Sequence, residues 1–291
     1  MMMVSVIVCT YNQERTIGRA LDAILSQECD ADFEVIIGED ASRDNTRRVC
    51  EEYAERYPGK VRLMPKAPNK GIVDNYYGCV REAKGEYIME CGGDDEWCPG
   101  RMQLCLDVMR QHSDVVQVFT QVYYRRGNTG EILTPNNDLF PMGLLSGQDV
   151  IDGMMHQRSG QMVCYAMTRR KAMMELMEEY PEFFAGRKYF AEDKQLTTLL
   201  GTKGNFVNLP DRTYYYTIDN SSITRGDIAK HWRYTKNMML MSHNLAKAVG
   251  YRKSLMPQYL HILFIVCRFT VWRLLSSLCG KLCQRCGKRD C

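Results

Sequence analysis

Two adjacent carboxylates, Asp94 and Asp95, follow a short apolar run within the segment Gly92-Gly93-Asp94-Asp95-Glu96. Adjacent carboxylates repel each other and raise each other's pKa unless a cation or a hydrogen-bond donor neutralises them. Mg2+ or Mn2+ would do so, because these cations bind one or two carboxylates and complete an octahedral shell with water and phosphate oxygens. The pair therefore predicts a metal site that holds a diphosphate, although a solvated acidic turn has the same pattern.

Two further sets of polar side chains follow apolar runs with the pattern of strands. The residues Thr10-Tyr11-Asn12 come directly after the run Val4–Cys9. Asp40 follows the run Phe33–Ile37. Ligands of an open parallel sheet bind at the carboxyl ends of its strands, so we expect both sets and the acidic pair to surround one ligand. Each set taken alone fits an ordinary turn or helix cap.

The elements that must position these residues alternate between strand-like and helix-like patterns. The run Val4–Cys9 is followed by apolar residues at helical spacing from Ile17 to Leu25, and this alternation continues to about Thr120. Such a pattern is typical of βαβ units around a parallel sheet. We therefore expect an α/β fold with a mostly parallel central sheet, in which residues 205–209 and 213–217 form two closing strands.

The composition is that of an ordinary globular protein, with 45% hydrophobic and 25% charged residues among 291. This excludes a disordered or fibrous chain. The formal net charge of +3 is too small, and its charges too dispersed, to favour a nucleic acid partner. The chain enters a strand pattern near Met1 without the features of a secretory signal, so we expect the folded part to face the cytoplasm.

Three segments resemble, in order and spacing, the successive motifs of the family 2 glycosyltransferases. They are Val4-Ser5-Val6-Ile7-Val8-Cys9-Thr10-Tyr11-Asn12, Glu39-Asp40-Ala41-Ser42-Arg43-Asp44-Asn45-Thr46 and Gly92-Gly93-Asp94-Asp95-Glu96-Trp97. The similarity is strong between these segments and weakens towards Thr224. It implies a GT-A type fold over residues 1–225, with a donor half over about 1–120 and an acceptor half over about 121–225. Residues 226–291 would form a helical C-terminal extension.

The resemblance also implies a binding site for the nucleotide of a nucleotide-sugar donor. In the family the first motif and the acidic residue of the second hold the base, usually uracil. By this match Asp40 would accept the imide N–H of the base, Tyr11 would stack on it, and Thr10 and Asn12 would lie nearby. Glu14 would support the loop from the first helical turn.

The acidic pair would hold the ribose through Asp94 and a Mg2+ or Mn2+ ion through Asp94 and Asp95. One departure is informative, because many members carry an acidic residue two positions before Asp94, where this sequence has Gly92. The departure leaves open which carboxylate contacts the metal. Glu90 or Glu96 would be the candidates to compensate.

The segment Ala191-Glu192-Asp193 resembles the family's Glu-Asp pair at the start of a helix near the acceptor. Inverting transfer needs a carboxylate that removes a proton from the acceptor hydroxyl as it attacks the anomeric carbon. On this match Asp193 is the candidate base and Glu192 orients it or binds the acceptor, whereas acids that favour a helix N-terminus have the same pattern. Trp97 and Tyr216 are candidates for sugar contacts, although core packing or ordinary strand aromatics explain them equally.

These features together imply an inverting, metal-dependent glycosyltransferase that moves a sugar from a UDP-sugar to a glycan or lipid-linked acceptor in cell-surface polysaccharide synthesis. A sugar nucleotidyltransferase is an alternative, but it should show a Gly-rich, basic phosphate loop after the first strand, and residues 11–15 contain no glycine. A non-catalytic, membrane-associated module that binds nucleotide-sugars is a second alternative, which Gly92 keeps open.

The tail over residues 259–291 is rich in both apolar and basic residues. Its apolar run is interrupted by charges, so it lacks the ~20 largely uncharged residues that a membrane span needs. Leu260 and Phe264 share one helical stripe with later apolar residues. A helix in the headgroup region of an anionic membrane, at the inner face of the cell membrane, fits this pattern. A helix docked on the catalytic domain and a dimer seam fit it as well.

Overall fold

Alternating side chains of β1 (Val4–Thr10) supply both faces of a central sheet. Val4, Val6 and Val8 enter one hydrophobic cluster, while Ile7 is buried on the opposite face, as the period of two along a strand requires. β1 pairs in parallel with β2 (Phe33–Glu39) on one side and with β4 (Tyr87–Gly92) on the other. It is therefore an interior strand, which explains why Val4, Val6, Ile7 and Val8 are apolar on both of its faces.

The computed structural model describes residues 4–134, 140–156, 166–186, 192–218 and 228–256, and residues 259, 260, 263, 264, 267 and 270. In these ranges ten strands form one sheet in the order β3-β2-β1-β4-β9-β6-β10-β5, with β7 paired to β6 and β8 paired to β10. The remaining strands are β3 (Val61–Leu63), β5 (Glu96–Trp97), β6 (Val115–Arg126), β7 (Ile132–Leu133), β8 (Gly143–Leu145), β9 (Ala166–Arg169) and β10 (Asn205–Ile218). β9 runs antiparallel to both β4 and β6, so β6 and β10 run parallel to β1.

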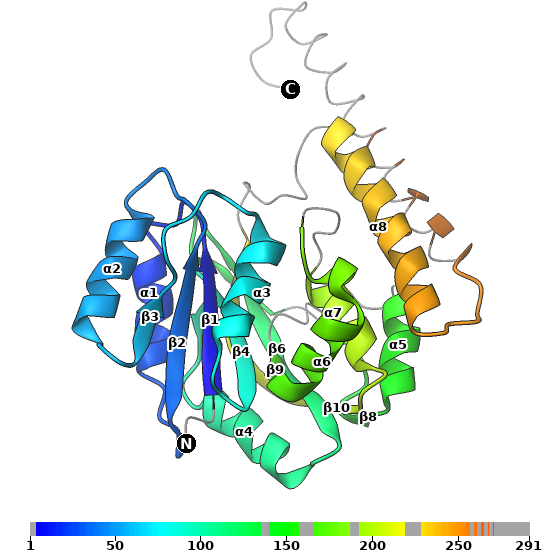
Figure 1. Cartoon of the computed structure of the whole chain (residues 1–291), viewed down its shortest axis with the longest axis horizontal. Coiled ribbons are helices and arrows are strands. Elements are labelled where there is room, and N and C mark those ends of the chain that lie inside the picture. Colours follow the sequence, from blue (N-terminus) through cyan, green and yellow to red (C-terminus); the bar gives the residue numbers. More distant parts are fainter. Residues whose placement is uncertain are drawn as a thin grey trace, which may run out of the picture. The chain divides into compact units, whose positions relative to one another are not determined.

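Helices cover both faces of this sheet (Figure 1). The helices of the α/β part are α1 (Ile17–Leu25), α2 (Thr46–Arg56), α3 (Ile72–Glu82), α4 (Arg101–Gln111), α5 (Gly147–His156), α6 (Arg170–Glu179), the 3-10 turn η2 (Pro181–Phe183) and α7 (Glu192–Leu200). Apolar residues of α1, α2 and α4 pack in the cluster that contains Val6, and α3 packs on the opposite face. The prediction of an α/β fold with a mostly parallel sheet is confirmed.

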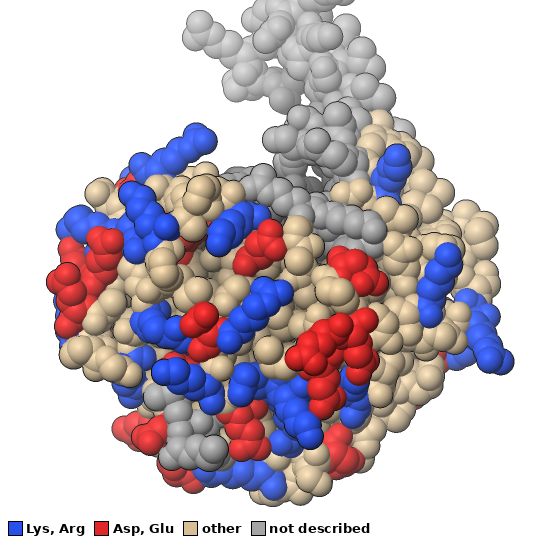
Figure 2. All heavy atoms as spheres, in the orientation of Figure 1, with Lys and Arg blue, Asp and Glu red and all other residues tan. Residues whose placement is uncertain are grey.

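The chain divides into two compact units, Met1–Asp219 and Asn220–Cys291. The first unit contains the sheet, and Figure 2 shows acidic and basic side chains interspersed over its visible face. The second unit contains α8 (Ile228–Ala248). Among the described residues, every helix is too short or too polar to cross a bilayer.

The prediction of two closing strands over residues 205–209 and 213–217 is wrong, because β10 is one continuous strand. Pro210 has no amide hydrogen to donate to a neighbouring strand. The pairing with β6 is accordingly irregular between Asn208 and Arg212, but the chain stays extended through it. The long strand carries Tyr214 and Thr217 to the carboxyl edge of the sheet, where the motif residues lie.

Candidate active site

The carboxyl ends of β1, β2 and β4 lie side by side. Cys9 is in register with Gly38 of β2 and with Gly92 of β4. The loops beyond these ends are joined by backbone hydrogen bonds, from Asp40 N to Thr10 O at 3.1 Å and from Gly93 N to Cys9 O at 3.1 Å. The structure therefore brings the first, second and third sequence motifs together at one edge of the sheet.

Reciprocal hydrogen bonds connect the loop after β1 to the loop after β2. Asn12, with a left-handed φ of 54°, donates from its backbone N to Ser42 Oγ at 2.9 Å and accepts from Arg43 N at 2.8 Å. Glu14 Oε2 accepts from the backbone N of Asn45 at 2.9 Å and from its side-chain amide at 2.8 Å. Tyr11 lies within this connected pair of loops and is 41% exposed, so its ring is accessible.

The carboxylate of Asp40 is buried where the loop after β2 meets the loop between β3 and α3. Its two oxygens accept hydrogen bonds from the backbone N of Lys70 at 2.7 Å and of Gly71 at 2.9 Å. Gly71 has a φ of 85°, a conformation that glycine adopts without strain. A carboxylate has about four lone-pair positions, so these two bonds hold Asp40 in place while leaving capacity for a further donor.

Asp95 points into the protein. It is 4% exposed, and its two oxygens accept hydrogen bonds from Tyr214 Oη at 2.9 Å and from Thr217 N at 2.7 Å. Burial, together with the negative charge of Asp94, raises the pKa of Asp95 to about 8. Both oxygens of Asp95 thus have hydrogen-bond partners inside the fold, and the assignment of Asp95 as a metal ligand stays a prediction.

Asp94 lies at the edge of the sheet and is partly buried. Its backbone carbonyl accepts hydrogen bonds from Arg19 Nη2 at 3.0 Å and from Thr217 Oγ1 at 2.6 Å. These bonds fix the backbone at Asp94 between α1 and β10. Within the described ranges, no group of three or more His, Cys, Asp or Glu side chains has the geometry to hold a metal.

Gly92 leaves room for the buried carboxylate of Asp95. A Cβ at position 92 would lie 2.7 Å from Asp95 Oδ2 and 3.1 Å from Asp94 Oδ1. Glu96 is engaged in ion pairs with Arg19 at 3.2 Å and Arg125 at 2.6 Å. Glu90 interacts with Tyr76 of α3, whose pKa is raised by burial and by this carboxylate. Both candidates to compensate for Gly92 are thus occupied with partners of their own.

Asp193 lies in the first turn of α7. One of its oxygens accepts a hydrogen bond from Lys194 N at 2.7 Å, and burial raises the pKa of its carboxyl above the ordinary value. Burial also lowers the pKa of the neighbouring Lys194 ammonium to about 8. β10 begins at the amino edge of the sheet, and α7 ends shortly before it. The last turn of α7 therefore lies towards the amino edge, and its first turn is directed towards the carboxyl edge. The side chain of Glu192 lies outside the described part of the chain.

The family model described as glycosyl transferase family 2 matches residues 5–188, which is more than half of the chain. The chain belongs to glycosyl transferase family 2. The resemblance predicted from the three motifs is therefore confirmed.

Several relatives of this glycosyltransferase have been described. The putative glycosyltransferase EpsE of Bacillus subtilis is 28% identical over 223 residues, which cover 75% of this chain and 79% of EpsE. The uncharacterized protein Rv1520 of Mycobacterium tuberculosis is 36% identical over 126 residues, or 42% of this chain and 36% of that protein. The chain thus matches about a third of the length of this mycobacterial relative.

Solved structures show the same fold. TarS 1–349 of S. aureus superposes with a TM-score of 0.62 at 16% identity, covering 82% of this chain and 65% of TarS 1–349. The mannosyltransferase PcManGT of Pyrobaculum calidifontis, in complex with GDP-Man and Mn2+, gives a TM-score of 0.56 at 19% identity, covering 90% of this chain and 69% of that one. These likenesses confirm the GT-A type fold of the glycosyltransferase.

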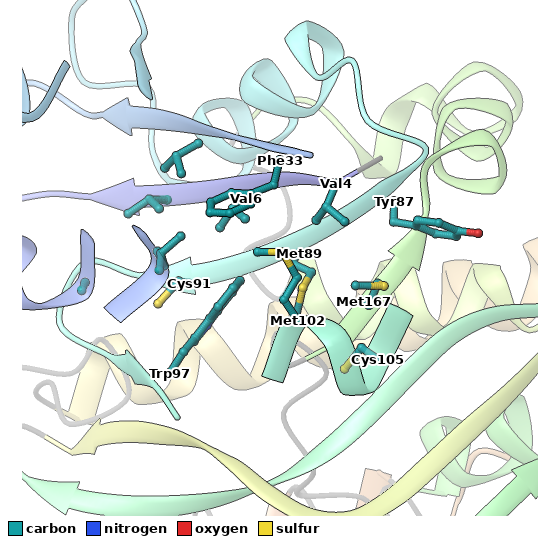
Figure 3. Packing of buried hydrophobic residues seen from close by; sticks show 14 of the residues in the cluster. Val4, Val6, Phe33, Tyr87, Met89, Cys91, Trp97, Met102, Cys105 and Met167 are labelled. Carbon is teal, nitrogen blue, oxygen red and sulfur yellow. The ribbon is translucent and has the colours of Figure 1, made fainter. Parts of the chain in front are cut away.

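Trp97 and Tyr216, the two candidate sugar contacts, both pack against other side chains of the protein. Trp97 is 2% exposed and packs in the hydrophobic cluster beside Met102 and Cys91 (Figure 3). The two-residue strand β5 turns this side chain inward, and the assignment of Trp97 as a sugar contact stays a prediction. Tyr216 is partly buried and packs edge-on against Tyr124 at 6.0 Å between ring centroids.

Sequence reasoning missed three residues that hold the acidic loop of the glycosyltransferase. Arg19 and Thr217 bind the backbone of Asp94, and Tyr214 binds the side chain of Asp95. Tyr214 begins a run of three tyrosines that ends at Tyr216, and such a run indicates an ordinary strand as readily as a sugar contact. Its partner is 119 positions away in the sequence, and no local pattern indicates such a contact.

Replacing Gly92 by Ala is expected to destabilise the glycosyltransferase by about 1–3 kcal/mol, because the added methyl group would displace the buried Asp95 carboxylate. The measurement is the melting temperature without ligand. Gly78→Ala is the matched control, since Gly78 lies within α3 and a Cβ there meets no atom within 4 Å. This control should be neutral or slightly stabilising. Equal melting temperatures for the two variants would contradict the packing explanation for Gly92.

Proposed function

We propose that this glycosyltransferase transfers a sugar, with inversion, from a UDP-sugar to a hydroxyl of a glycan or lipid-linked acceptor, using Mg2+ or Mn2+ on the diphosphate. The acceptor would belong to cell-surface polysaccharide synthesis. The observation that supports this most is the meeting of Tyr11, Asp40 and Asp94 at one edge of the sheet. One loop offers an aromatic ring, the next a fixed hydrogen-bond acceptor, and the third an edge carboxylate.

The nucleotide base would be recognised by the first two loops. Tyr11 is accessible for stacking, and Asp40 is held by two backbone N–H groups with lone pairs remaining. An acceptor in this position selects a base with an imide N–H, such as uracil, over cytosine, which has none. A base that leaves a buried acceptor unpaired is rejected more strongly than one that only loses contact area.

The divalent cation would be held by Asp94. Mg2+ and Mn2+ commonly bind proteins through one or two carboxylates and take further ligands from substrate phosphates and water. Asp94, at the edge of the sheet, fits this ligand set as one carboxylate. Asp95 would hold the loop through its hydrogen bonds to Tyr214 and Thr217. When bound, the cation would neutralise the charge that develops on the leaving diphosphate.

Asp193 would act as the general base. In an inverting step the acceptor oxygen forms a bond to the anomeric carbon as the bond to the diphosphate breaks, and the hydroxyl proton passes to Asp193. Burial raises the pKa of Asp193 above the ordinary value, which makes its carboxylate a stronger proton acceptor. Glu192 precedes it on the helix and would contact the acceptor.

Thermal unfolding with nucleoside diphosphates tests the proposal. UDP with Mn2+, at about 100 times its dissociation constant, should raise the melting temperature by about 5–10 °C, and the shift should shrink without Mn2+. CDP is the matched control ligand, because it keeps the ring size and diphosphate but lacks the imide N–H. Equal shifts with CDP would contradict recognition by Asp40, and stabilisation by GDP alone would assign a different donor.

Mass spectrometry of donor hydrolysis across a panel of UDP-sugars separates the remaining alternatives. Release of UDP from one donor supports the transferase. Binding of UDP without turnover of any donor, with or without added acceptors, would favour the non-catalytic module. A sugar nucleotidyltransferase would instead require UTP and a sugar 1-phosphate.

A further inference from the structure

Acidic and basic residues are segregated along the chain. No Asp or Glu occurs between Ile228 and Arg289, whereas this segment contains twelve Lys and Arg. The preceding residues, 1–227, contain 26 Lys and Arg against 34 Asp and Glu. The net charge of +3 is therefore the sum of an acidic α/β part and a strongly basic C-terminal part. The expectation that the charges are dispersed along the chain is wrong.

The described residues that follow α8 expose an apolar stripe. Met256, Leu260 and Phe264 are 57%, 59% and 63% exposed, and Cys267 is exposed as well. At 100° per residue, spacings of four, four and three place these side chains within an arc of about 80° on one helix face. Isolated exposed apolar residues are ordinary on a protein surface, but a contiguous stripe indicates an interaction site.

α8 presents a second exposed face, which mixes apolar and basic side chains. Its members recur at helical spacing and are Trp232, Lys236, Leu240, His243 and Lys247. Trp232 Nε1 donates a hydrogen bond to Thr270 Oγ1 at 3.2 Å, so the first turns of α8 lie beside the end of the described segment. We call the described residues of the two segments together the C-terminal hairpin (residues 228–256, 259, 260, 263, 264, 267 and 270). Arg252 and Lys253, in the turn between them, are exposed too.

We propose that the C-terminal hairpin docks on the surface of an anionic lipid bilayer. Its apolar stripe would enter the boundary between headgroups and acyl chains, and its Lys and Arg side chains would contact the anionic headgroups. The described helices do not have the length and apolarity to span the bilayer. The site is independent of the donor-binding loops and goes beyond the proposed function.

Two observations favour a bilayer over other occupants of this surface. A nucleic acid or a soluble polyanion would attract the basic residues but would leave Leu260 and Phe264 in water. A symmetric dimer through this surface would cover the apolar stripe but would bring two strongly basic segments together, which repel each other. An anionic bilayer is the partner that satisfies the charge and the apolar stripe at once.

Co-sedimentation of the full chain with lipid vesicles tests this proposal. Binding is expected to vesicles of equal parts phosphatidylglycerol and phosphatidylcholine, to be at least tenfold weaker with phosphatidylcholine alone, and to fall as salt rises. A double variant, Leu260→Asp with Phe264→Asp, should lose at least about tenfold in affinity for the anionic vesicles. The matched control is Ile132→Asp with Leu144→Asp, which changes two apolar residues of the first unit that are 51% and 61% exposed.

Three results would overturn the proposal. They are equal binding to both kinds of vesicle, equal loss in the hairpin and control variants, and a dimer in light scattering that the hairpin variant dissociates while neither protein binds vesicles. A fourth such result is duplex DNA binding that exceeds vesicle binding and is lost in the hairpin variant but not in the control variant, which would assign the surface to a nucleic acid. The UDP-induced thermal shift of each variant reports on the donor site separately, so failure of the membrane proposal leaves the proposed function testable.

Discussion

Asp193→Asn lowers kcat by roughly 10³-fold and leaves the affinity for UDP nearly unchanged, if Asp193 is the general base of the reaction. Asn has the same shape and keeps an oxygen that accepts the hydrogen bond from Lys194 N, so the first turn of α7 should be preserved. It cannot take a proton at neutral pH. The measurements are kcat with a donor sugar that the wild-type protein turns over, and UDP affinity by titration.

The pH dependence gives a second readout of the same role. A base must be deprotonated, so the activity of the wild-type protein falls as pH falls through the pKa of Asp193. Because burial raises this pKa above the ordinary value, the acid limb of kcat/KM should lie above the range of an exposed Asp. The limb should be absent from the residual activity of Asp193→Asn.

Asp149→Asn is the matched control for Asp193→Asn. Asp149 also lies in the first turn of a helix, α5, where it accepts hydrogen bonds from the backbone N and Oγ of Ser146. If acids at both helix starts only stabilise helix N-termini, the two variants should lose comparable stability and keep kcat. That outcome would show that Asp193 is not the general base and that its carboxylate only stabilises the start of α7.

The sheet and the meeting of the three loops could be predicted because both depend on local patterns. A run such as Val4–Cys9, followed by polar residues and then by apolar residues at helical spacing, indicates a strand, a turn and a helix. Parallel strands then place their polar ends at one edge, without any knowledge of long-range contacts. Asp40 and Asp94 were located by this reasoning alone.

The hydrogen-bond partners of the acidic pair could not be predicted, because they are distant in sequence. Asp95 is turned inward by Tyr214 and Thr217, which are 119 and 122 positions further along the chain. The same strand, β10, pairs with β5 and turns Trp97 into the core. A periodic pattern describes which face of a strand is buried, but it does not reveal which strand will lie beside it.

Asp94→Asn is expected to weaken Mn2+-dependent binding of UDP by at least about 100-fold while changing the stability of the unliganded protein little. The factor follows from the loss of a direct ligand, since changes to groups that merely orient metal ligands already cost about 10–100-fold in affinity. Asp94 is partly exposed, and the groups that hold its loop bind its backbone carbonyl, which the substitution preserves. Titration of UDP with and without Mn2+ measures the effect.

Asp95→Ala should behave in the opposite way. The substitution leaves the Tyr214 hydroxyl and the Thr217 N–H without their buried acceptor, which costs about 1–3 kcal/mol for each unsatisfied group. We therefore expect a clearly lower melting temperature, with UDP binding still dependent on Mn2+ in the fraction that remains folded. If Asp95→Ala instead abolished the Mn2+ dependence at unchanged stability, and Asp94→Asn did not, the inward carboxylate would be the metal ligand. The loop after β4 would then have to change conformation when the donor binds, and Asp95 would have to give up both of its hydrogen bonds.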